Sequence, residues 1–164
     1  MGTMLRTTIG DLFDEVASRF PDREALIDLP RGRRYSYQEL LIIVNRLARG
    51  FLKLGIRKGE HLALWTPNLS ESIITEFAAA KIGAVLMTLD TNAQPQQLGY
   101  LLRQSDSQAL IMSEGTNGTE HIEMIRQLCP EVDTSAPGQL DCRALPELRR
   151  LIVISDRTHP GMLT

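Results

Sequence analysis

The sequence predicts an α/β protein with a mainly parallel sheet, helices on both faces of that sheet, and a small N-terminal hairpin. Four short runs are almost wholly apolar, which is typical of strands buried on both faces of a parallel sheet; they are residues 61–66, 84–89, 108–112 and 151–155. Amphipathic helical segments separate these runs. This alternation predicts βαβ units, whose crossovers are expected to be right-handed.

Ahead of the first apolar run, the sequence predicts a helix and then a hairpin. Apolar residues recur at helical spacing from Ile9 to Phe20, and Pro21 ends the pattern. Residues 24–29 read as a short strand, residues 30–33 as a turn, and residues 34–36 as the returning strand. Such a strand-turn-strand pattern indicates a small hairpin.

A second helix begins at a capping box. Ser36 is followed three residues later by Glu39. The Ser36 hydroxyl oxygen can therefore accept a hydrogen bond from the Glu39 backbone amide, while the Glu39 carboxylate accepts one from the Ser36 backbone amide. The predicted helix buries one apolar stripe, and Gly55 stands where a left-handed C-terminal cap belongs.

Three further helices connect the apolar runs. We expect Ser70 to cap a helix that continues to about Ile82 and ends at Gly83. Pro95 suits the first turn of the next helix, and residues 120–129 form the last. Residues 130–146 are rich in Pro, Gly, Asp and Ser, so we expect an exposed connection there. Residues 1–164 are expected to form a single α/β domain.

Composition excludes several classes of protein. The 164 residues hold 18 Lys and Arg against 20 Asp and Glu, a formal net charge of −2, and show no basic stripe. Nucleic acid is therefore not an expected partner. No run reaches the roughly 20 apolar residues of a membrane span, and the N-terminus lacks the apolar core of a signal peptide. We expect a cytoplasmic protein whose two cysteines, Cys129 and Cys142, are free thiols.

Catalytic motifs are missing from the sequence. There is no Walker A loop, no dinucleotide-binding glycine motif and no nucleophile elbow, and His61, His121 and His159 are scattered. The loop 113–119 could cradle a phosphate with its backbone amides. However, Glu120 and His121 follow it where a phosphate-binding loop needs a lysine, so an ordinary strand-to-helix turn is favoured.

Several short motifs occur in an order and spacing that, taken together, are specific. They are YSYQEL (35–40), NRLA (45–48), LGIRKGE (54–60), LALWTPN (62–68), AAAKIGAV (78–85), LGYLL (98–102), ALI (109–111) and LPELRRLIV (145–153). In this arrangement the chain resembles the N-terminal part of the adenylate-forming superfamily, which includes acyl-CoA synthetases, aryl-CoA ligases, luciferases and peptide-synthetase adenylation domains. The fold it resembles is the N-terminal subdomain of acyl-CoA synthetases.

The resemblance implies a two-step ligase reaction for the complete enzyme. ATP activates a carboxylic acid as an acyl-adenylate and releases pyrophosphate; the thiol of coenzyme A then attacks the acyl carbon and AMP leaves. ATP, magnesium and coenzyme A are the implied cofactors. The family's phosphate loop, ribose-binding acid and C-terminal lysine would lie beyond this chain, so we expect it to be catalytically inactive alone, with no catalytic, cofactor-binding or metal-binding residue of its own. The alternatives are an adenylating enzyme with a carrier-protein acceptor and a stand-alone interaction module.

Fold logic also nominates a substrate crevice. Ligands of an open parallel sheet bind beyond the carboxyl ends of its strands, which nominates Thr66, Asn68, Asp90 and Asn92. Asn68 equally suits a turn that leads into the next helix. The expected partners are the remainder of the ligase chain and a carboxylic acid substrate. A second copy of the chain is also expected, because an exposed apolar face or sheet edge favours association.

Overall fold

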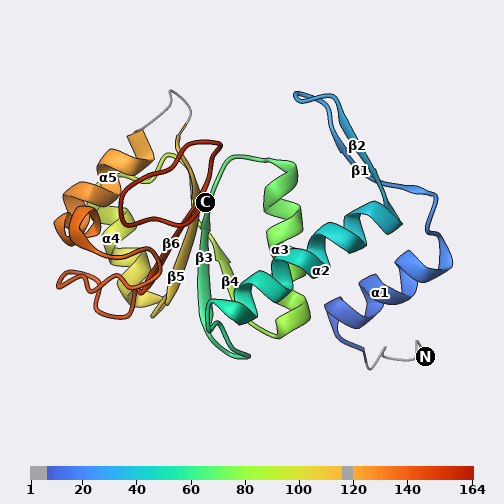
Figure 1. The fold of residues 1–164 in the computed structure, drawn as a ribbon, viewed down its shortest axis with the longest axis horizontal. Helices are drawn as coiled ribbons and strands as arrows, with labels where there is room; N and C mark the ends of the chain where they lie inside the picture. Colours follow the sequence, from blue (N-terminus) through green and yellow to red (C-terminus); the bar gives the residue numbers. More distant parts are fainter. Residues whose placement is uncertain (1–6, 116–119) are drawn as a thin grey trace. The chain divides into compact units, whose positions relative to one another are not determined.

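The computed structural model describes residues 7–115 and 120–164, which form two compact units (Figure 1). Unit 1 consists of residues 7–58 and 69–84, and unit 2 of residues 59–68, 85–115 and 120–164. The chain therefore leaves unit 1 to form one strand, returns to it for one helix, and then completes unit 2.

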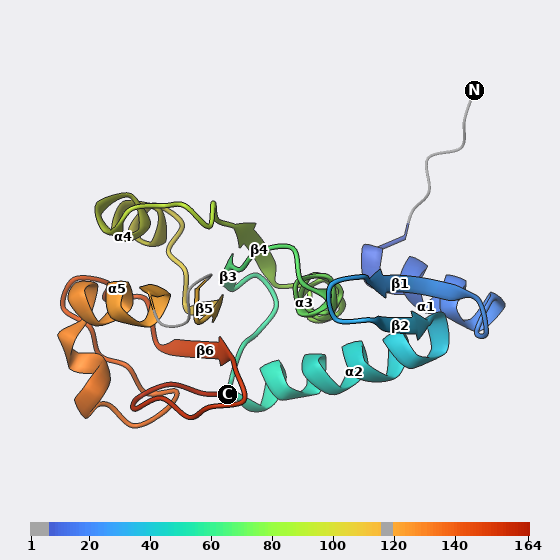
Figure 2. The ribbon, with the colours of Figure 1, turned by 90° about the horizontal axis from the view of Figure 1, so that it is seen from above.

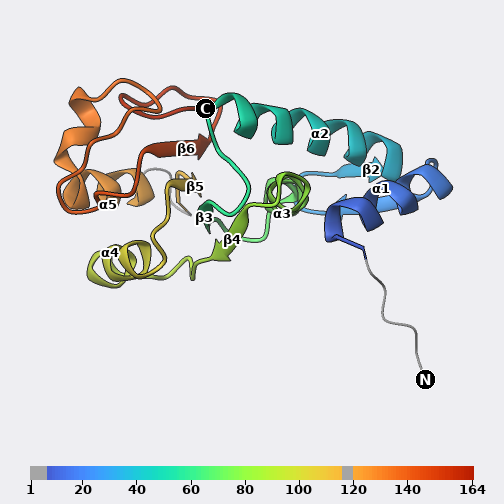
Figure 3. The same cartoon turned by 90° about the horizontal axis from the view of Figure 1, so that it is seen from below.

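Unit 1 packs three helices and the predicted hairpin. The helices are α1 (Ile9–Arg19), α2 (Tyr37–Lys53) and α3 (Ser70–Ile82), and Figure 3 shows them side by side. The antiparallel hairpin is β1 (Glu24–Asp28) with β2 (Arg33–Ser36). Its presence confirms the hairpin predicted from the sequence.

Ion pairs tie the hairpin to the start of α3. The Glu71 carboxylate accepts from Arg31 at 2.5 Å and from Arg33 at 3.1 Å. Beside them, the Ser70 hydroxyl donates to the buried Asp28 carboxylate at 2.9 Å. Our expectation that Ser70 caps α3 is therefore wrong. The N-cap is Leu69, and the Ser70 hydroxyl donates to Asp28 instead.

Unit 2 is built on a four-stranded parallel sheet with the strand order β4-β3-β5-β6. Its strands are β3 (His61–Trp65), β4 (Val85–Thr88), β5 (Ala109–Ser113) and β6 (Arg150–Ile154). The helices α4 (Pro95–Gln104) and α5 (Glu120–Leu128) lie side by side (Figure 2). The α/β class and the parallel sheet are thereby confirmed.

The core of unit 2 lies on the sheet face that α4 and α5 cover. Alternate side chains of three strands point into it, and they are Ala63, Trp65, Leu110, Met112, Leu151 and Val153. Intervening residues such as Leu62, Leu64 and Ile111 are buried as well. Burial of consecutive strand residues explains why the sequence shows continuous apolar runs rather than alternation.

The segment 130–146 is exposed over most of its length, but a few of its side chains anchor it to unit 2. It contains the 3-10 helix η1 (Pro130–Thr134), and Val132, Leu140 and Leu145 are each 2% exposed or less. These three side chains join the core of unit 2. Its Pro and Asp residues and both of its alanines are exposed, and composition did not reveal the side chains that anchor it.

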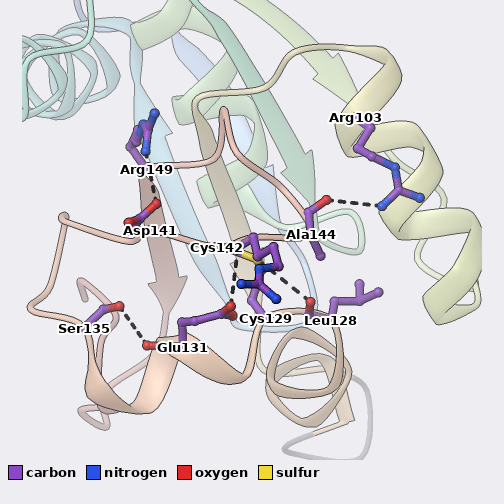
Figure 4. The surroundings of a disulfide bond; sticks show 10 residues. Arg103, Leu128, Cys129, Glu131, Ser135, Asp141, Cys142, Ala144 and Arg149 are labelled. Carbon is purple, nitrogen blue, oxygen red and sulfur yellow. Dashed lines mark hydrogen bonds and ion pairs between the residues drawn. A yellow bond between two sulfur atoms is a disulfide. The ribbon is translucent and has the colours of Figure 1, made fainter.

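Cys129 and Cys142 form a disulfide, which contradicts the expected free thiols (Figure 4). Their Cα atoms are 5.5 Å apart, and both residues are buried in the core. The sequence separation of 13 gave no indication of this contact, because η1 and the turn after it fold back to bring Cys142 beside the end of α5.

Candidate functional site

The strand order of unit 2 locates a topological switch point. The connection after β3 leads toward β4 at one edge, whereas the connection after β5 leads toward β6 at the other. The carboxyl ends of β3 and β5 therefore flank a topological switch point, the place where open α/β sheets form their binding crevice. We call the loops that follow the four strands the carboxyl edge.

The loops after β3 and β4 are joined at this edge by Trp65. This residue ends β3, is fully buried, and donates from its indole nitrogen to the carbonyl of Asp90 at 3.0 Å. Thr66 follows it directly as a half-buried residue, and Asn68 lies exposed in a bend two residues before α3. The indole thus fixes how these two loops approach each other.

Asp90 and Asn92 come together in one turn after β4. The Asp90 carboxylate accepts from the Asn92 backbone at 2.9 Å and from its side-chain amide at 3.2 Å. Both residues are exposed. All four nominated residues therefore lie at the carboxyl edge, and their role in substrate binding stays a prediction.

His121, in the first turn of α5, is buried beside this edge. Its ring stacks on Trp65 with the centroids 3.7 Å apart, and its Nδ1 lies 3.2 Å from the Ser113 carbonyl. Burial lowers the pKa of His121, while hydrogen bonds to the backbone of Ser113 and Thr91 oppose that shift. A neutral, stacked imidazole of this kind secures α5 against the ends of β3 and β5.

Glu114 forms the most extensive polar cluster of the carboxyl edge. Its carboxylate accepts from the Ser155 hydroxyl at 2.6 Å, from Arg157 at 2.5 and 3.1 Å, and from His159 at 2.7 Å. Hydrogen bonds from Arg157 and Ser155 lower the pKa of Glu114 to about 2, against the opposing effect of burial. We call these four residues the Glu114 cluster.

Two carboxylates of the carboxyl edge, those of Glu114 and Asp90, are engaged in contacts within the chain. The Glu114 carboxylate accepts hydrogen bonds from three side chains, and one carboxylate oxygen of Asp90 accepts hydrogen bonds from Asn92 within the same turn. Across residues 7–115 and 120–164, no group of three His, Cys, Asp or Glu side chains could hold a metal. The loop 113–119, considered as a phosphate cradle, lies partly outside the described residues.

Unit 1 contains a separate open hollow of about 400 Å³ between α1, α2 and α3. Its wall carries two cations, Arg49 and Lys81, and Lys81 is paired with Asp14. In the described part of the chain, no helix has the length and apolar character needed to cross a membrane.

Comparison with known proteins gives the family. The family model described as AMP-binding enzyme matches residues 13–158. The Bacillus subtilis protein YngI, which is named as an acyl-CoA synthetase, is 40% identical over 162 residues, covering 99% of this chain and 30% of YngI. The mouse medium-chain acyl-CoA ligase ACSF2 is 32% identical over 160 residues, covering 98% of this chain and 26% of ACSF2.

Solved structures agree on the fold. A Rhodopseudomonas palustris protein named as a long-chain-fatty-acid CoA ligase superposes with a TM-score of 0.77 at 23% identity, covering 95% of this chain and 35% of that one. The chain thus spans about a third or less of the relatives that it matches. With most of its length matched by the family model, the chain belongs to the AMP-binding enzyme family.

Proposed function

We propose that this chain is the N-terminal part of an ATP-dependent ligase that joins a carboxylic acid to coenzyme A. The observation that carries the proposal is the family match over residues 13–158, together with 40% identity to a relative named as an acyl-CoA synthetase. The switch point between β3 and β5 supports it, because open α/β sheets bind their ligands at such a point. In this proposal Thr66, Asn68, Asp90 and Asn92 border the substrate.

The nucleotide chemistry is assigned to residues outside this chain. Adenylate formation requires preorganised charge around the transferring phosphoryl group, and the Glu114 and Asp90 carboxylates at the carboxyl edge are engaged in contacts within the chain. In this proposal ATP, magnesium and coenzyme A bind the complete ligase. The chain contributes the fold and part of the acid-binding wall.

We expect the 164-residue chain to be catalytically silent and a downstream extension of its reading frame to be active. The two proteins should be compared for ATP–pyrophosphate exchange and for acyl-CoA formation with a panel of carboxylic acids, beside calorimetric titration with ATP and magnesium. The extended protein should give both reactions with a medium- or long-chain acid, and the 164-residue chain neither. Exchange by the 164-residue chain would contradict the proposed division of labour.

Two alternatives are separated by the same comparison. An extended protein that exchanges pyrophosphate but transfers the acyl group only to a carrier protein would be an adenylating enzyme with a different acceptor. A stop codon directly after Thr164 would favour a stand-alone module that keeps the fold without the chemistry. An extended protein that binds no ATP would contradict the ligase proposal itself.

A further inference from the structure

The residues after β6 return alongside that strand. We call residues 155–163 the strap. The Leu163 amide donates to the Leu151 carbonyl and the Val153 amide donates to the Leu163 carbonyl, both at 2.8 Å. These two bonds make a parallel bridge between Ile152 and Leu163, and the C-terminal segment that contains Leu163 is red in Figure 1. A bridge of one residue pair is too short to be stable alone, so the strap needs other anchors.

The first anchor is the Glu114 cluster, which holds the near end of the strap. Ser155, Arg157 and His159 all bond the Glu114 carboxylate. The Arg157 backbone amide also donates to the Ser155 hydroxyl at 2.8 Å, which fixes the local turn. This anchor contains no residue of η1.

The second anchor is η1, which seats the far end of the strap. Gly161 is buried with φ +70°, and a Cβ added to it would lie 1.8 Å from the Val132 carbonyl oxygen. Only glycine fits so close to this carbonyl. Met162, next along the chain, is 4% exposed and joins the core of unit 2. The position of Val132 therefore determines where residues 161–163 can lie.

The Cys129–Cys142 disulfide holds η1 in place. Cys129 immediately precedes η1, and the disulfide closes a segment with a sequence separation of 13 (Figure 4). One contact inside this segment is incomplete: among the described residues, Glu131 Oε2 is buried without a hydrogen-bond partner. An unsatisfied buried oxygen weakens the segment, which increases its dependence on the covalent link.

We propose that this disulfide is a redox control on the docking of the strap. A dithiol reductant transfers two electrons and two protons: the Cys129–Cys142 bond breaks, two cysteine thiols form, and the reductant becomes a cyclic disulfide. Once reduced, η1 loses its covalent constraint, Val132 no longer provides a fixed seat for Gly161, and the bridge at Leu163 opens. The Glu114 cluster keeps the near end docked. The proposal does not depend on the proposed ligase activity.

Hydrogen exchange on the 164-residue chain tests this proposal. The chain is compared in its oxidised form and after refolding with dithiothreitol, with complete reduction verified by alkylation. Reduction should speed exchange at the Leu163 and Val153 amides by at least about tenfold. The backbone amides of α2 in unit 1 should exchange at the same rate in the oxidised and reduced forms.

Two variants separate the anchors. The double variant Cys129→Ala/Cys142→Ala should exchange rapidly at Leu163 whether or not dithiothreitol is present. Glu114→Gln should loosen residues 155–159 while the redox response at Leu163 remains. Equal exchange at Leu163 in oxidised and reduced chains would overturn the proposal. So would a uniform increase across β3, β5 and β6, because that result means general destabilisation rather than release of the strap.

Discussion

At the scale of single residues, Glu114 is predicted to make stability depend on pH. Its pKa falls from the ordinary 4.5 to about 2 in the folded chain. A carboxylate with a depressed folded pKa stabilises the protein fully above pH 4.5, and this stabilisation is lost as the pH falls toward 2. Glu114→Gln keeps the size but removes the charge, and should cost about 1.5–3 kcal/mol at pH 7.

Denaturant unfolding at several pH values measures this effect. The difference between the original chain and Glu114→Gln should shrink steadily from pH 5 to the lowest pH at which the chain still folds. Glu147→Gln is the matched control, because Glu147 is exposed. A Glu114→Gln penalty that stays constant across this pH range would show that the loss comes from packing rather than from charge.

Residue roles that depend on sequence neighbours were predictable, whereas roles that depend on partners far along the chain were not. Gly55 was expected in a left-handed conformation and Gly83 at a helix end, and their φ values are +84° and +71°. The Glu114 cluster was missed because its partners are 41–45 residues away. The disulfide was missed for a related reason: only the folded path of 130–141 brings its two cysteines together.

At the scale of elements, the capping box of α2 is predicted to stabilise unit 1. Ser36 accepts from the Glu39 amide at 3.2 Å, and the Glu39 carboxylate accepts from the Ser36 amide at 2.8 Å. Ser36→Ala should lower the free energy of unfolding by about 0.5–2 kcal/mol. Ser18→Ala, at an exposed position of α1, should change it by about 0.5 kcal/mol or less. Paired denaturant melts measure both, and equal effects would refute the cap.

Elements with a strong period or a local signal were predicted well. The capping box placed the start of α2, Pro95 placed the start of α4, and the four apolar runs placed the strands of the sheet. The errors occurred where a tertiary contact replaced a local one. Ser70 bonds Asp28 rather than the backbone of α3, and Cys142 pairs with Cys129 rather than remaining a free thiol.

At the scale of the whole molecule, sequence reasoning gave the class of sheet but not its strand order. Connections alone do not reveal that β4 and β6 are the edges while β3 and β5 are central. That order locates the switch point, so it determines which loops form the candidate site. The nominated residues follow β3 and β4, whereas the Glu114 cluster, which the sequence did not reveal, follows β5 and β6.

The strand order also identifies an edge through which two copies could associate. Within the described residues, β4 pairs only with β3, so its other side presents unpaired backbone groups. Val85 in this strand is 49% exposed, which adds apolar surface to that edge. At the opposite edge, Leu163 already pairs with part of β6. Exposed strand edges tend to pair with other chains, and two copies of one strand can do so antiparallel about a two-fold axis.

We therefore predict that the 164-residue chain forms a dimer through β4. Light scattering coupled to size exclusion, over a range of concentrations, should show a concentration-dependent dimer. Val85→Lys should return the chain to a monomer, because a lysine places a charge at the pairing edge. Ile42→Lys is the control: it removes an exposed apolar side chain from α2 and leaves β4 intact, so its dimer should persist. A monomer at every concentration would contradict the prediction, and loss of the dimer in both variants would assign it to general hydrophobic contact rather than to strand pairing.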